Sequence, residues 1–481
     1  MLSVAVVGAG ITGLSAAWEL TSRRPDVSVV LLEASSAVGG KLALGAVAGL
    51  DVDLGAESVL ARRPEAVDLA REVGLGADLE APRAIGASVW SAGALRALPA
   101  GTLMGVPGRL DTLTGLLSAA EVAEVRAEPA GTWAPLEGDV DVASFVAQRV
   151  GPAVVERLVE PLLGGVYAGS AANLSLRATV PALWRAAVAG TSVVDAARAA
   201  AAAGVATRGA GPGEQAAPVF VGVRGGVGRL PVAVAAALRG RGVDVRLGVT
   251  VRELGRRERG WRLVTGPTTD PEALDVDAVV LAVPAAPTAR LLRDEAPLAA
   301  AELAAVEAAS MAIVTFAFRR NEIRGLLGSG VLVPPVDGRY VKAATFSSAK
   351  WGWLDEAAGE HVVLRASVGR HGQVADLQRP DDELVQRVLA DLRALPGAVL
   401  PEPVDHRVTR WGGGLPQYAV GHVGAMARVA DAVAGLGGLE LAGATYEGVG
   451  IPACVASGRA AGARVATHLD GRAVGYGTLG G

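Results

Sequence analysis

The sequence predicts an α/β fold with a parallel sheet, a second, mixed sheet and a mainly helical insertion. Three observations support this prediction. A strand–helix–strand pattern opens the chain over residues 2–33, a stretch rich in Ala, Leu, Glu and Arg covers about 111–210, and strand-like apolar runs return after it. The chain has 481 residues, which at roughly 150 residues per domain is about three domains of material.

The first elements are read directly from apolar spacing. Residues 2–7 form an apolar run that ends at glycine, as a buried parallel strand does. Residues 11–22 carry apolar side chains at helical spacing, and residues 27–32 predict a second strand. Residues 64–74 predict a helix, with proline in its first turn and glycine as a stop signal.

The middle and end of the chain alternate between helical and strand-like patterns. The insertion has helical periods at Val142–Val150 and Ala153–Leu163 and ends in a turn-rich linker, 209–218. A helix at about 452–469 and a glycine-rich tail, 471–481, which we expect to lack regular structure, close the chain. Strands are predicted between the linker and the last helix at Val243–Leu247, Trp261–Val264, Ala278–Val283, 311–318, 331–333 and 362–368.

Composition excludes several classes of protein. Hydrophobic residues make up 51% and charged residues 20% of the chain, so a large core can form and global disorder is excluded. A net charge of −4 at pH 7 is too balanced for a nucleic-acid binder that relies on a basic surface. One cysteine, Cys454, excludes a disulfide framework, and the five histidines lack metal-ligand spacing, so we expect no metal.

The sequence shows neither of two signals for membrane insertion or export. No segment reaches the ~18 unbroken apolar residues of a membrane-spanning helix, and the first residues lack a basic region and a cleavage signal. We therefore expect a cytoplasmic protein, and weak peripheral contact with a membrane stays open.

The first chemical motif is a glycine-rich turn between the first strand and the first helix. It reads Gly8, Ala9, Gly10, Ile11, Thr12 and Gly13, and the next strand ends in Glu33, 20 residues beyond Gly13. This context is the Rossmann-like dinucleotide fingerprint. Gly8 permits the tight turn, Gly10 lets backbone approach a pyrophosphate, and Gly13 allows close packing of helix and strand. Glu33 can accept hydrogen bonds from ribose hydroxyls, which disfavours NADP.

Segments near both ends of the chain extend this motif. A glycine pair and a base follow Glu33 (Gly39, Gly40 and Lys41), and this arrangement resembles the GG motif of the FAD-dependent amine-oxidase-like superfamily, where the base is commonly Arg. DLGAESV at 53–59 resembles the superfamily's loop below the flavin ring. LAGATYEGVGIPACVASGRAAG at 441–462 resembles its closing segment, where a helix start near the flavin stabilises the anionic reduced form.

Four further segments narrow the resemblance. They are LRALPAGTLMGVP (95–107), EPLLGGVYAGSAANLSLRATVP (160–181), RWGGGLPQYAVGH (410–422) and YEGVGIPACVASGR (446–459). Together they resemble the protoporphyrinogen oxidase family, and most of all its bacterial coproporphyrinogen III oxidases, from residue 1 to about 469. The resemblance implies FAD-binding parts at 1–80, 211–286 and 431–470, substrate-domain parts at 81–110 and 287–430, the helical insertion at 111–210 and the tail 471–481.

The resemblance also implies which residues contact FAD. Val251 lies in a strand whose backbone would pair with the adenine edge, and Trp411 would lie near the flavin, although an ordinary half-buried core tryptophan is the alternative. Cys454 is interpreted as a small buried thiol and not as a covalent flavin link. The expected contacts are Gly8, Ala9, Gly10, Ile11, Thr12, Gly13, Glu33, Gly39, Gly40, Lys41, Gly55, Ala56, Glu57, Ser58, Val251, Trp411, Gly443, Val449, Gly450 and Ile451.

The implied reaction is the oxidation of a porphyrinogen. In three rounds the macrocycle loses hydride equivalents to the flavin, and dioxygen takes the electrons and becomes hydrogen peroxide. Coproporphyrinogen III, with four carboxylates, is the expected substrate, and hand-off of the product to a ferrochelatase is the expected partnership. Arginine forks suit such carboxylates, and the candidates are Arg62, Arg63 and Arg96, each with a solvated surface charge as the alternative. No catalytic base is identified.

Other functions stay open at this point. Protoporphyrinogen IX oxidation is the nearest alternative. An amine oxidase would need an aromatic cage, but the chain has only 5 Tyr and 5 Phe, and a carotenoid desaturase would need a long apolar groove. A non-catalytic escort that resembles the GDP-dissociation inhibitors would keep the fingerprint without flavin chemistry, and the intact GGK, GAES and GVGI segments argue against it.

Overall fold

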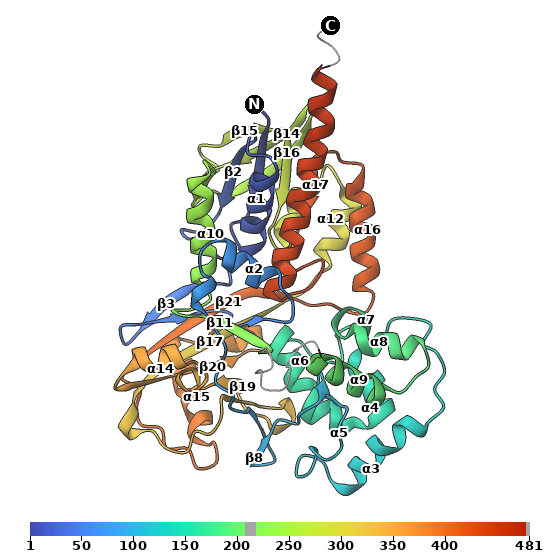
Figure 1. Ribbon diagram of the computed structural model, residues 1–481, viewed down its shortest axis with the longest axis vertical. Coiled ribbons are helices and arrows are strands. Elements are labelled where there is room, and N and C mark those ends of the chain that lie inside the picture. Colours follow the sequence, from blue (N-terminus) through green and yellow to red (C-terminus); the bar gives the residue numbers. More distant parts are fainter. Residues whose placement is uncertain (207–217, 478–481) are drawn as a thin grey trace.

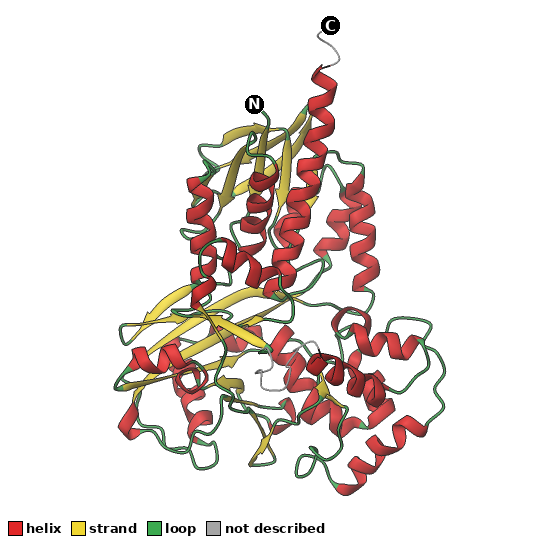
Figure 2. Cartoon of the chain, viewed as in Figure 1, coloured by secondary structure: helices red, strands yellow, loops and turns green. Residues whose placement is uncertain are grey.

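The computed structural model describes the backbone of residues 1–206 and 218–477 and the side chains of 1–203 and 218–471. All but the last residue of the expected linker 209–218 therefore lies outside the described residues. Figure 1 shows an upper body that holds the N-terminus and the last helix, and two lower bodies side by side. One lower body is built around a sheet and the other is mainly helical (Figure 2).

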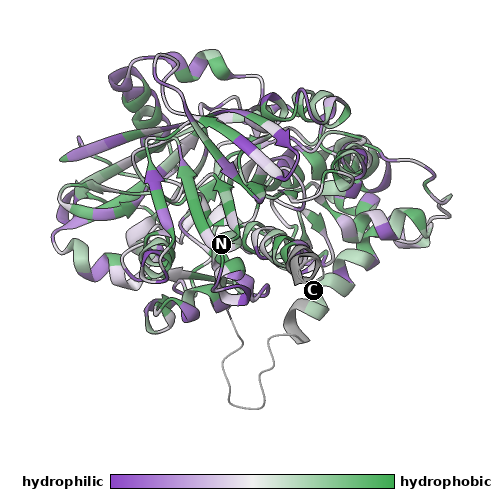
Figure 3. Cartoon of the chain, turned by 90° about the horizontal axis from the view of Figure 1, so that it is seen from above, coloured by the Kyte–Doolittle hydropathy of each residue, from purple (hydrophilic) through white to green (hydrophobic). Residues whose placement is uncertain are grey.

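The upper body is built on a five-stranded parallel sheet in the order β12-β2-β1-β16-β22. These strands come from both ends and the middle of the chain, so this body is discontinuous in sequence. Seen from above, the strands nearest the N-terminus are coloured as hydrophobic (Figure 3). The bounds are β1 (Ser3–Val7), β2 (Ser28–Glu33), β12 (Asp244–Leu247), β16 (Ala278–Leu281) and β22 (Leu439–Leu441).

Alternate residues of these strands point into two different cores. Val4, Val6 and Leu31 face helices of the N- and C-terminal segments. Ala5, Val7 and Leu32 face a three-stranded antiparallel sheet and three other helices. The first layer holds α1 (Ile11–Arg23), α2 (Glu65–Glu72), α10 (Arg229–Gly240) and α17 (Ile451–Gly477); the second holds β13 (Val251–Arg257), β14 (Gly260–Thr265), β15 (Glu272–Val276), α11 (Ala285–Leu291), α12 (Pro297–Ala304) and α16 (His422–Ala434).

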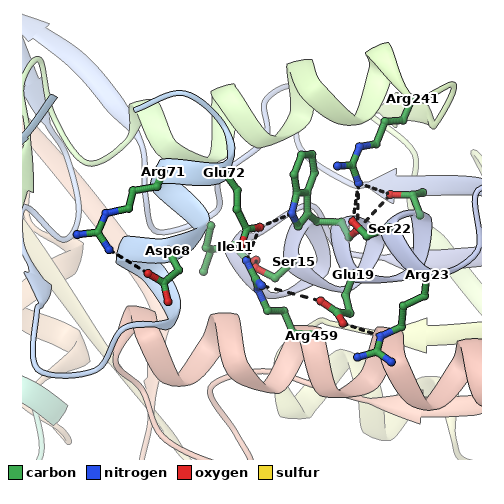
Figure 4. Close-up of polar contacts among 12 residues, drawn as sticks. Ile11, Ser15, Glu19, Ser22, Arg23, Asp68, Arg71, Glu72, Arg241 and Arg459 are labelled. Atoms are coloured by element: carbon green, nitrogen blue, oxygen red, sulfur yellow. Dashed lines mark hydrogen bonds and ion pairs between the residues drawn. The ribbon is translucent and has the colours of Figure 1, made fainter. Parts of the chain in front are cut away.

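An ion-pair network holds α1 against α17 and α2 (Figure 4). Arg459 of α17 contacts Glu72 of α2 at 2.7 Å and Glu19 of α1 at 3.9 Å. The Glu72 carboxylate also accepts a hydrogen bond of 2.6 Å from the Trp18 indole N–H. The guanidinium of Arg241 lies 3.5 Å from the centroid of the Trp18 ring. The first and last helices of this body are thus fixed to one another.

The first lower body contains a seven-stranded mixed sheet. Its order is β21-β17-β20-β19-β18-β7-β8, antiparallel except for the β18–β7 pair. Helix α15 packs on one face of this sheet, and α13 and α14 pack on the other. The bounds are β7 (Ser88–Ser91), β8 (Ala94–Ala97), β17 (Ala308–Arg319), β18 (Gly330–Leu332), β19 (Val341–Thr345), β20 (His361–Val368), β21 (Asp405–Pro416), α13 (Ser347–Lys350), α14 (Gly352–Ala358) and α15 (Asp381–Arg393).

The second lower body is the expected helical insertion. It has its own apolar core and a buried ion pair, in which Arg149 lies 2.8 Å from Glu128. Val155–Val159 forms a π-helical stretch between two helices that the apolar period predicted as one run. The helices are α3 (Ala119–Ala127), α4 (Val142–Val150), α5 (Pro152–Val154), α6 (Glu160–Tyr167), α7 (Leu176–Thr179), α8 (Pro181–Val188) and α9 (Val193–Ala206).

The remaining strands are short and form three small sheets, β3-β4, β5-β11-β6 and β9-β10. They are β3 (Leu44–Val47), β4 (Leu50–Asp53), β5 (Val59–Leu60), β6 (Leu79–Glu80), β9 (Thr102–Leu103), β10 (Val106–Pro107) and β11 (Phe220–Val223). Among the described helices, none combines the length and the apolar character that a bilayer crossing needs.

Two details differ from the sequence-based expectations. The tail expected to be irregular from residue 471 is helical as far as Gly477, because α17 continues through its glycines. Helices α11, α12 and α16 pack in the core of the upper body, although all or most of each lies within 287–430, the range expected to belong to the substrate part. The apolar faces of these helices predict that they are buried. They do not show whether the core of the upper body or that of the lower sheet buries them.

Candidate functional site

The geometry of the Gly8–Gly13 turn accounts for the glycine at each of three positions. Gly8 has φ +100°, and a Cβ there would lie 2.7 Å from the Ala282 carbonyl oxygen. A Cβ on Gly13 would lie 1.9 Å from the Gly8 oxygen, whereas one on Gly10 would meet nothing within 4 Å. Gly8 and Gly13 are therefore needed for the turn and its packing. Gly10 faces open space, where a ligand can approach its backbone.

The N-terminus of α1 is available to an anion. Its N-cap, Gly10, provides no side-chain hydrogen bond, and the first turn has no acidic residue. The first N–H groups of a helix have no acceptor within the helix, and they carry the positive end of its dipole. A pyrophosphate fits this arrangement.

Glu33 accepts three backbone hydrogen bonds, from the glycine turn, its own loop and the segment before β13. Its carboxylate accepts hydrogen bonds of 2.8 Å from the backbone N–H groups of Ala9 and Ser35. Its carbonyl oxygen accepts another, 2.8 Å, from Val249, two residues before Val251. Glu33 thus lies beside the glycine turn and the start of β13.

The glycine pair lies directly against the first glycine turn. Gly39 donates a hydrogen bond of 2.8 Å to the Ala9 carbonyl oxygen and forms a β-bridge with Gly10. A Cβ on Gly40 would lie 3.6 Å from the Gly10 Cα. The two glycine-rich segments therefore form one continuous backbone surface, as a pyrophosphate site requires.

Lys41, Gly55 and Trp411 meet below this surface. A Cβ on Gly55 would lie 1.8 Å from the Lys41 carbonyl oxygen and 3.4 Å from Cζ2 of Trp411. The Trp411 indole N–H donates a hydrogen bond of 3.0 Å to the Leu54 oxygen. Burial lowers the pKa of Lys41. The half-buried Trp411 therefore contacts the start of the DLGAES loop, and it also packs against the apolar cluster that includes Val52 and Leu54, so its place near a flavin stays a prediction.

The Glu57 carboxylate forms ion pairs with two cations of the first lower body. Its carboxylate lies 2.6 Å from Lys350 and 2.8 Å from Arg365, and the latter also donates to the Gly55 oxygen. Burial alone would raise the pKa of Glu57, but the ammonium of Lys350 and the guanidinium of Arg365 outweigh it and lower the pKa to about 2. The Glu57 side chain and the Gly55 carbonyl oxygen therefore anchor the 55–58 loop to the first lower body.

The closing segment reaches the same place from the other end of the chain. Gly443 donates a hydrogen bond of 3.1 Å to Ser457 Oγ, and a Cβ on Gly443 would lie 3.9 Å from the Thr12 side chain. A Cβ on Gly458 would lie 2.1 Å from the Thr12 oxygen, so α17 lies in close contact with α1. Val449 and Gly450 directly precede Ile451, the first residue of α17, and Gly458 of this helix packs on the first turn of α1. Cys454 is buried there, and burial raises the pKa of its thiol.

The three candidate arginines are not brought together. Arg62 is exposed, and Arg63 pairs with Glu65 at 2.6 Å. Arg96 lies on the edge strand β8 and donates to the Gly115 oxygen at 3.1 Å. Trp411 lies on the opposite edge strand, β21, and six strand spacings of ~4.8 Å separate the two edges by roughly 29 Å along the sheet.

Sequence reasoning missed a buried cationic pair on the lower sheet. Lys342 of β19 is 5% exposed, and its ammonium has no hydrogen-bond partner among the described residues. Burial and the nearby Arg370 lower its pKa to about 8. Arg370 in turn interacts with Glu160 at the start of α6. Lys342 is one of three lysines among 45 basic residues, and that rarity was the only signal in the sequence.

It also missed Asp53 and the role of the PQY segment. Asp53 accepts hydrogen bonds of 2.9 Å from the N–H groups of Val227 and Gly228, and burial raises its pKa to about 6. Tyr418 packs against Tyr167 and His422 and bonds to the loop before α17. Both residues lie inside motifs that indicated the family, DLGAES and LPQYAVGH. The motifs alone do not show these side-chain contacts.

Two glycine-rich segments and two helix N-termini on the parallel sheet, with Trp411 of the mixed sheet nearby, fit a flavin-dependent oxidoreductase. A sequence model described as "Flavin containing amine oxidoreductase" matches residues 11–466. The chain therefore belongs to the flavin-containing amine oxidoreductase family.

Named relatives are similar over nearly the whole chain. A coproporphyrinogen III oxidase of Mycobacterium bovis is 38% identical over 95% of this chain and 96% of its own length. One of Bacillus subtilis is 30% identical over 97% and 98%. The crystal structure of a putative protoporphyrinogen oxidase from Exiguobacterium superposes with a TM-score of 0.82, at 32% identity, covering 98% of this chain and 99% of that chain.

Proposed function

We propose that the protein oxidises coproporphyrinogen III to coproporphyrin III in haem biosynthesis, with FAD as its cofactor. Three molecules of dioxygen accept the six electrons and six protons and leave as three molecules of hydrogen peroxide. The observation that supports this proposal best is the full-length similarity to relatives of that name, on a chain whose glycine-rich segments form one continuous backbone surface.

The residues of this chain would bind and orient the cofactor chiefly through backbone. Gly10, Gly39 and Gly40 offer backbone without side chains at the expected pyrophosphate position, and Glu33 lies where ribose hydroxyls are expected. Trp411 fixes the Leu54 carbonyl beside Gly55. The bound flavin supplies the two-electron acceptor for hydride from the methylene bridges of the substrate.

The proposal assigns no general base to the protein. Loss of hydride makes the pyrrole N–H groups of the macrocycle acidic, and tautomerisation can release the protons. The protein then contributes by positioning the substrate and excluding water.

The decisive experiment compares two substrates. Coproporphyrinogen III and protoporphyrinogen IX are prepared anaerobically, and kcat/KM is measured for each with the FAD-loaded protein in air. We expect a clear preference for coproporphyrinogen III and one hydrogen peroxide for every two electrons removed. A preference for protoporphyrinogen IX would reverse the assignment, and no oxidation of either would refute the proposal. A protein that binds no FAD would refute the proposed cofactor.

Arg62 is the best candidate for a substrate carboxylate. It is exposed just after the 55–58 loop, whereas Arg63 is already paired with Glu65. We expect Arg62→Ala to raise KM several-fold with little change in kcat. Arg96→Ala, which removes an exposed arginine from the distant sheet edge, is the matched control and should leave both constants unchanged. Equal KM values for the wild type and Arg62→Ala would exclude Arg62.

A further inference from the structure

We propose that Tyr418 is a positioning residue for the flavin, because its hydroxyl clamps the loop 444–448 that leads into α17. The inference rests on the FAD site proposed above. It assigns a role to the LPQYAVGH segment, which is remote in sequence from the glycine motifs.

The Tyr418 hydroxyl is bonded at both ends of this loop. It donates to the Ala444 carbonyl oxygen and accepts a hydrogen bond of 2.9 Å from the Gly448 N–H. One phenolic hydroxyl thereby satisfies a backbone acceptor and a backbone donor that lie four residues apart. Tyr418 itself is 3% exposed, so water cannot easily replace these bonds.

His422 adds a third tie to the same loop. Its ring stacks on the Tyr418 ring, with centroids 4.1 Å apart and an interplanar angle of 14°. Its Nε2 lies 2.9 Å from the Thr445 carbonyl oxygen. A carbonyl oxygen only accepts, so Nε2 carries the proton, and burial, which lowers the pKa of His422, favours the neutral ring.

The clamp is held from the side of the helical insertion. The Tyr418 carbonyl oxygen accepts a hydrogen bond of 2.7 Å from the Ser175 N–H. The Tyr167 ring at the end of α6 lies 5.6 Å from the Tyr418 ring. Gln417 donates to the Tyr167 carbonyl oxygen at 2.8 Å. These contacts fix the backbone and ring of Tyr418, so its hydroxyl is held in a defined position against the loop.

The loop determines where the α17 N-terminus begins. Val449 and Gly450 follow the loop immediately and precede Ile451, the first residue of the helix. The positive end of a helix stabilises negative charge close to it and loses this effect within about one turn. The position of loop 444–448 should therefore set how strongly the protein favours reduced over oxidised flavin.

The test removes only the hydroxyl. In FAD-loaded Tyr418→Phe we expect reduced flavin to be favoured about tenfold less, which is a potential more negative by about 30 mV for a two-electron couple. The visible flavin spectrum should shift too, while KM for the porphyrinogen stays within twofold. Tyr340→Phe is the matched control, because the Tyr340 hydroxyl also bonds to a backbone oxygen, of Asp376, at 3.1 Å but lies at the lower sheet. Its potential and spectrum should equal those of the wild type.

A second pair of variants keeps the test open if Tyr418→Phe folds poorly. His422→Leu should lower the potential in the same direction, and His422→Gln, which retains a donor for the Thr445 oxygen, should restore it. Potentials and spectra identical to the wild type in Tyr418→Phe and His422→Leu would overturn the inference, as would a change in thermal stability alone. A wild-type protein that fails to bind FAD would overturn the proposed function instead.

Discussion

In the upper body, the expected cofactor contacts come mostly from backbone, whereas on the lower sheet the groups that stand out are buried charged side chains. Gly8, Gly13 and Gly39 each stand where a Cβ would collide with neighbouring backbone. Glu57 instead depends on Lys350 and Arg365, and the Lys342 ammonium has no hydrogen-bond partner in the part of the chain that the structure describes. Backbone sites are specified locally, and charged sites are specified by the assembly of the fold.

The largest effect is expected where a buried charge loses its partner. Glu57→Gln leaves Lys350 and Arg365 without their carboxylate and should destabilise the protein by about 3–5 kcal/mol, measured by urea unfolding. Glu65→Gln breaks the more exposed pair with Arg63 and should cost at most ~1 kcal/mol. Equal losses in the two variants would contradict the comparison.

The same carboxylate predicts an acid sensitivity. The pKa of Glu57 is about 2 in the folded protein against a usual value of 4.5, so the folded state binds fewer protons between these values. Its stabilisation is therefore complete above pH 4.5 and is lost as the pH falls toward 2. The difference in unfolding free energy between wild type and Glu57→Gln should shrink over this range.

Substitutions at Gly13 and Gly10 distinguish the effect of a glycine on packing from its effect on FAD binding. Gly13→Ala places a Cβ 1.9 Å from the Gly8 oxygen and should cost about 1–3 kcal/mol in the absence of FAD. Gly10→Ala meets nothing within 4 Å, so it should cost the FAD-free protein only the ~0.5–1 kcal/mol by which alanine is a poorer N-cap than glycine. We expect its Kd for FAD to rise at least tenfold, measured by flavin titration. Unchanged FAD affinity in Gly10→Ala would place the pyrophosphate elsewhere.

The expected effect of removing the buried Lys342 ammonium has the opposite sign. Lys342→Met replaces a buried ammonium that has no hydrogen-bond partner among the described residues by an apolar chain of similar volume, and should stabilise the protein at pH 7 by roughly 1–3 kcal/mol. The folded pKa of about 8 lies below the usual 10.5, so wild-type stability should rise with pH between these values. The variant should lack this rise. Destabilisation in Lys342→Met would mean that the ammonium has an anionic partner.

The sequence predicted most of the upper body, since its signals are local. The strands at 2–7 and 27–32 and the helix at 11–22 are confirmed to within a residue or so as β1, β2 and α1. The mixed sheet and the helical insertion are confirmed as well. Glycine requirements reflect the conformation and close contacts of the turn itself, so a motif of six residues carries the information.

The side-chain roles on the lower sheet could not be predicted in this way. Glu57 meets Arg365 from 308 residues away, and the Tyr418 hydroxyl meets Gly448 from 30. No apolar period encodes such pairs, because they depend on how β20 and α17 are placed after folding. The packing of α11, α12 and α16 with the parallel sheet was hidden for the same reason.

The order of the strands has a consequence for synthesis of the protein. The central strand β1 pairs at once with β2, but its other edge waits for β16, about 270 residues later in the chain, and the sheet is complete only with β22, shortly before α17. During synthesis the unpaired backbone edge of β1 therefore stays exposed until β16 has been translated. Stable capture of the nucleotide should wait for α17, and a chaperone that shields strand edges would help most before β16 is in place.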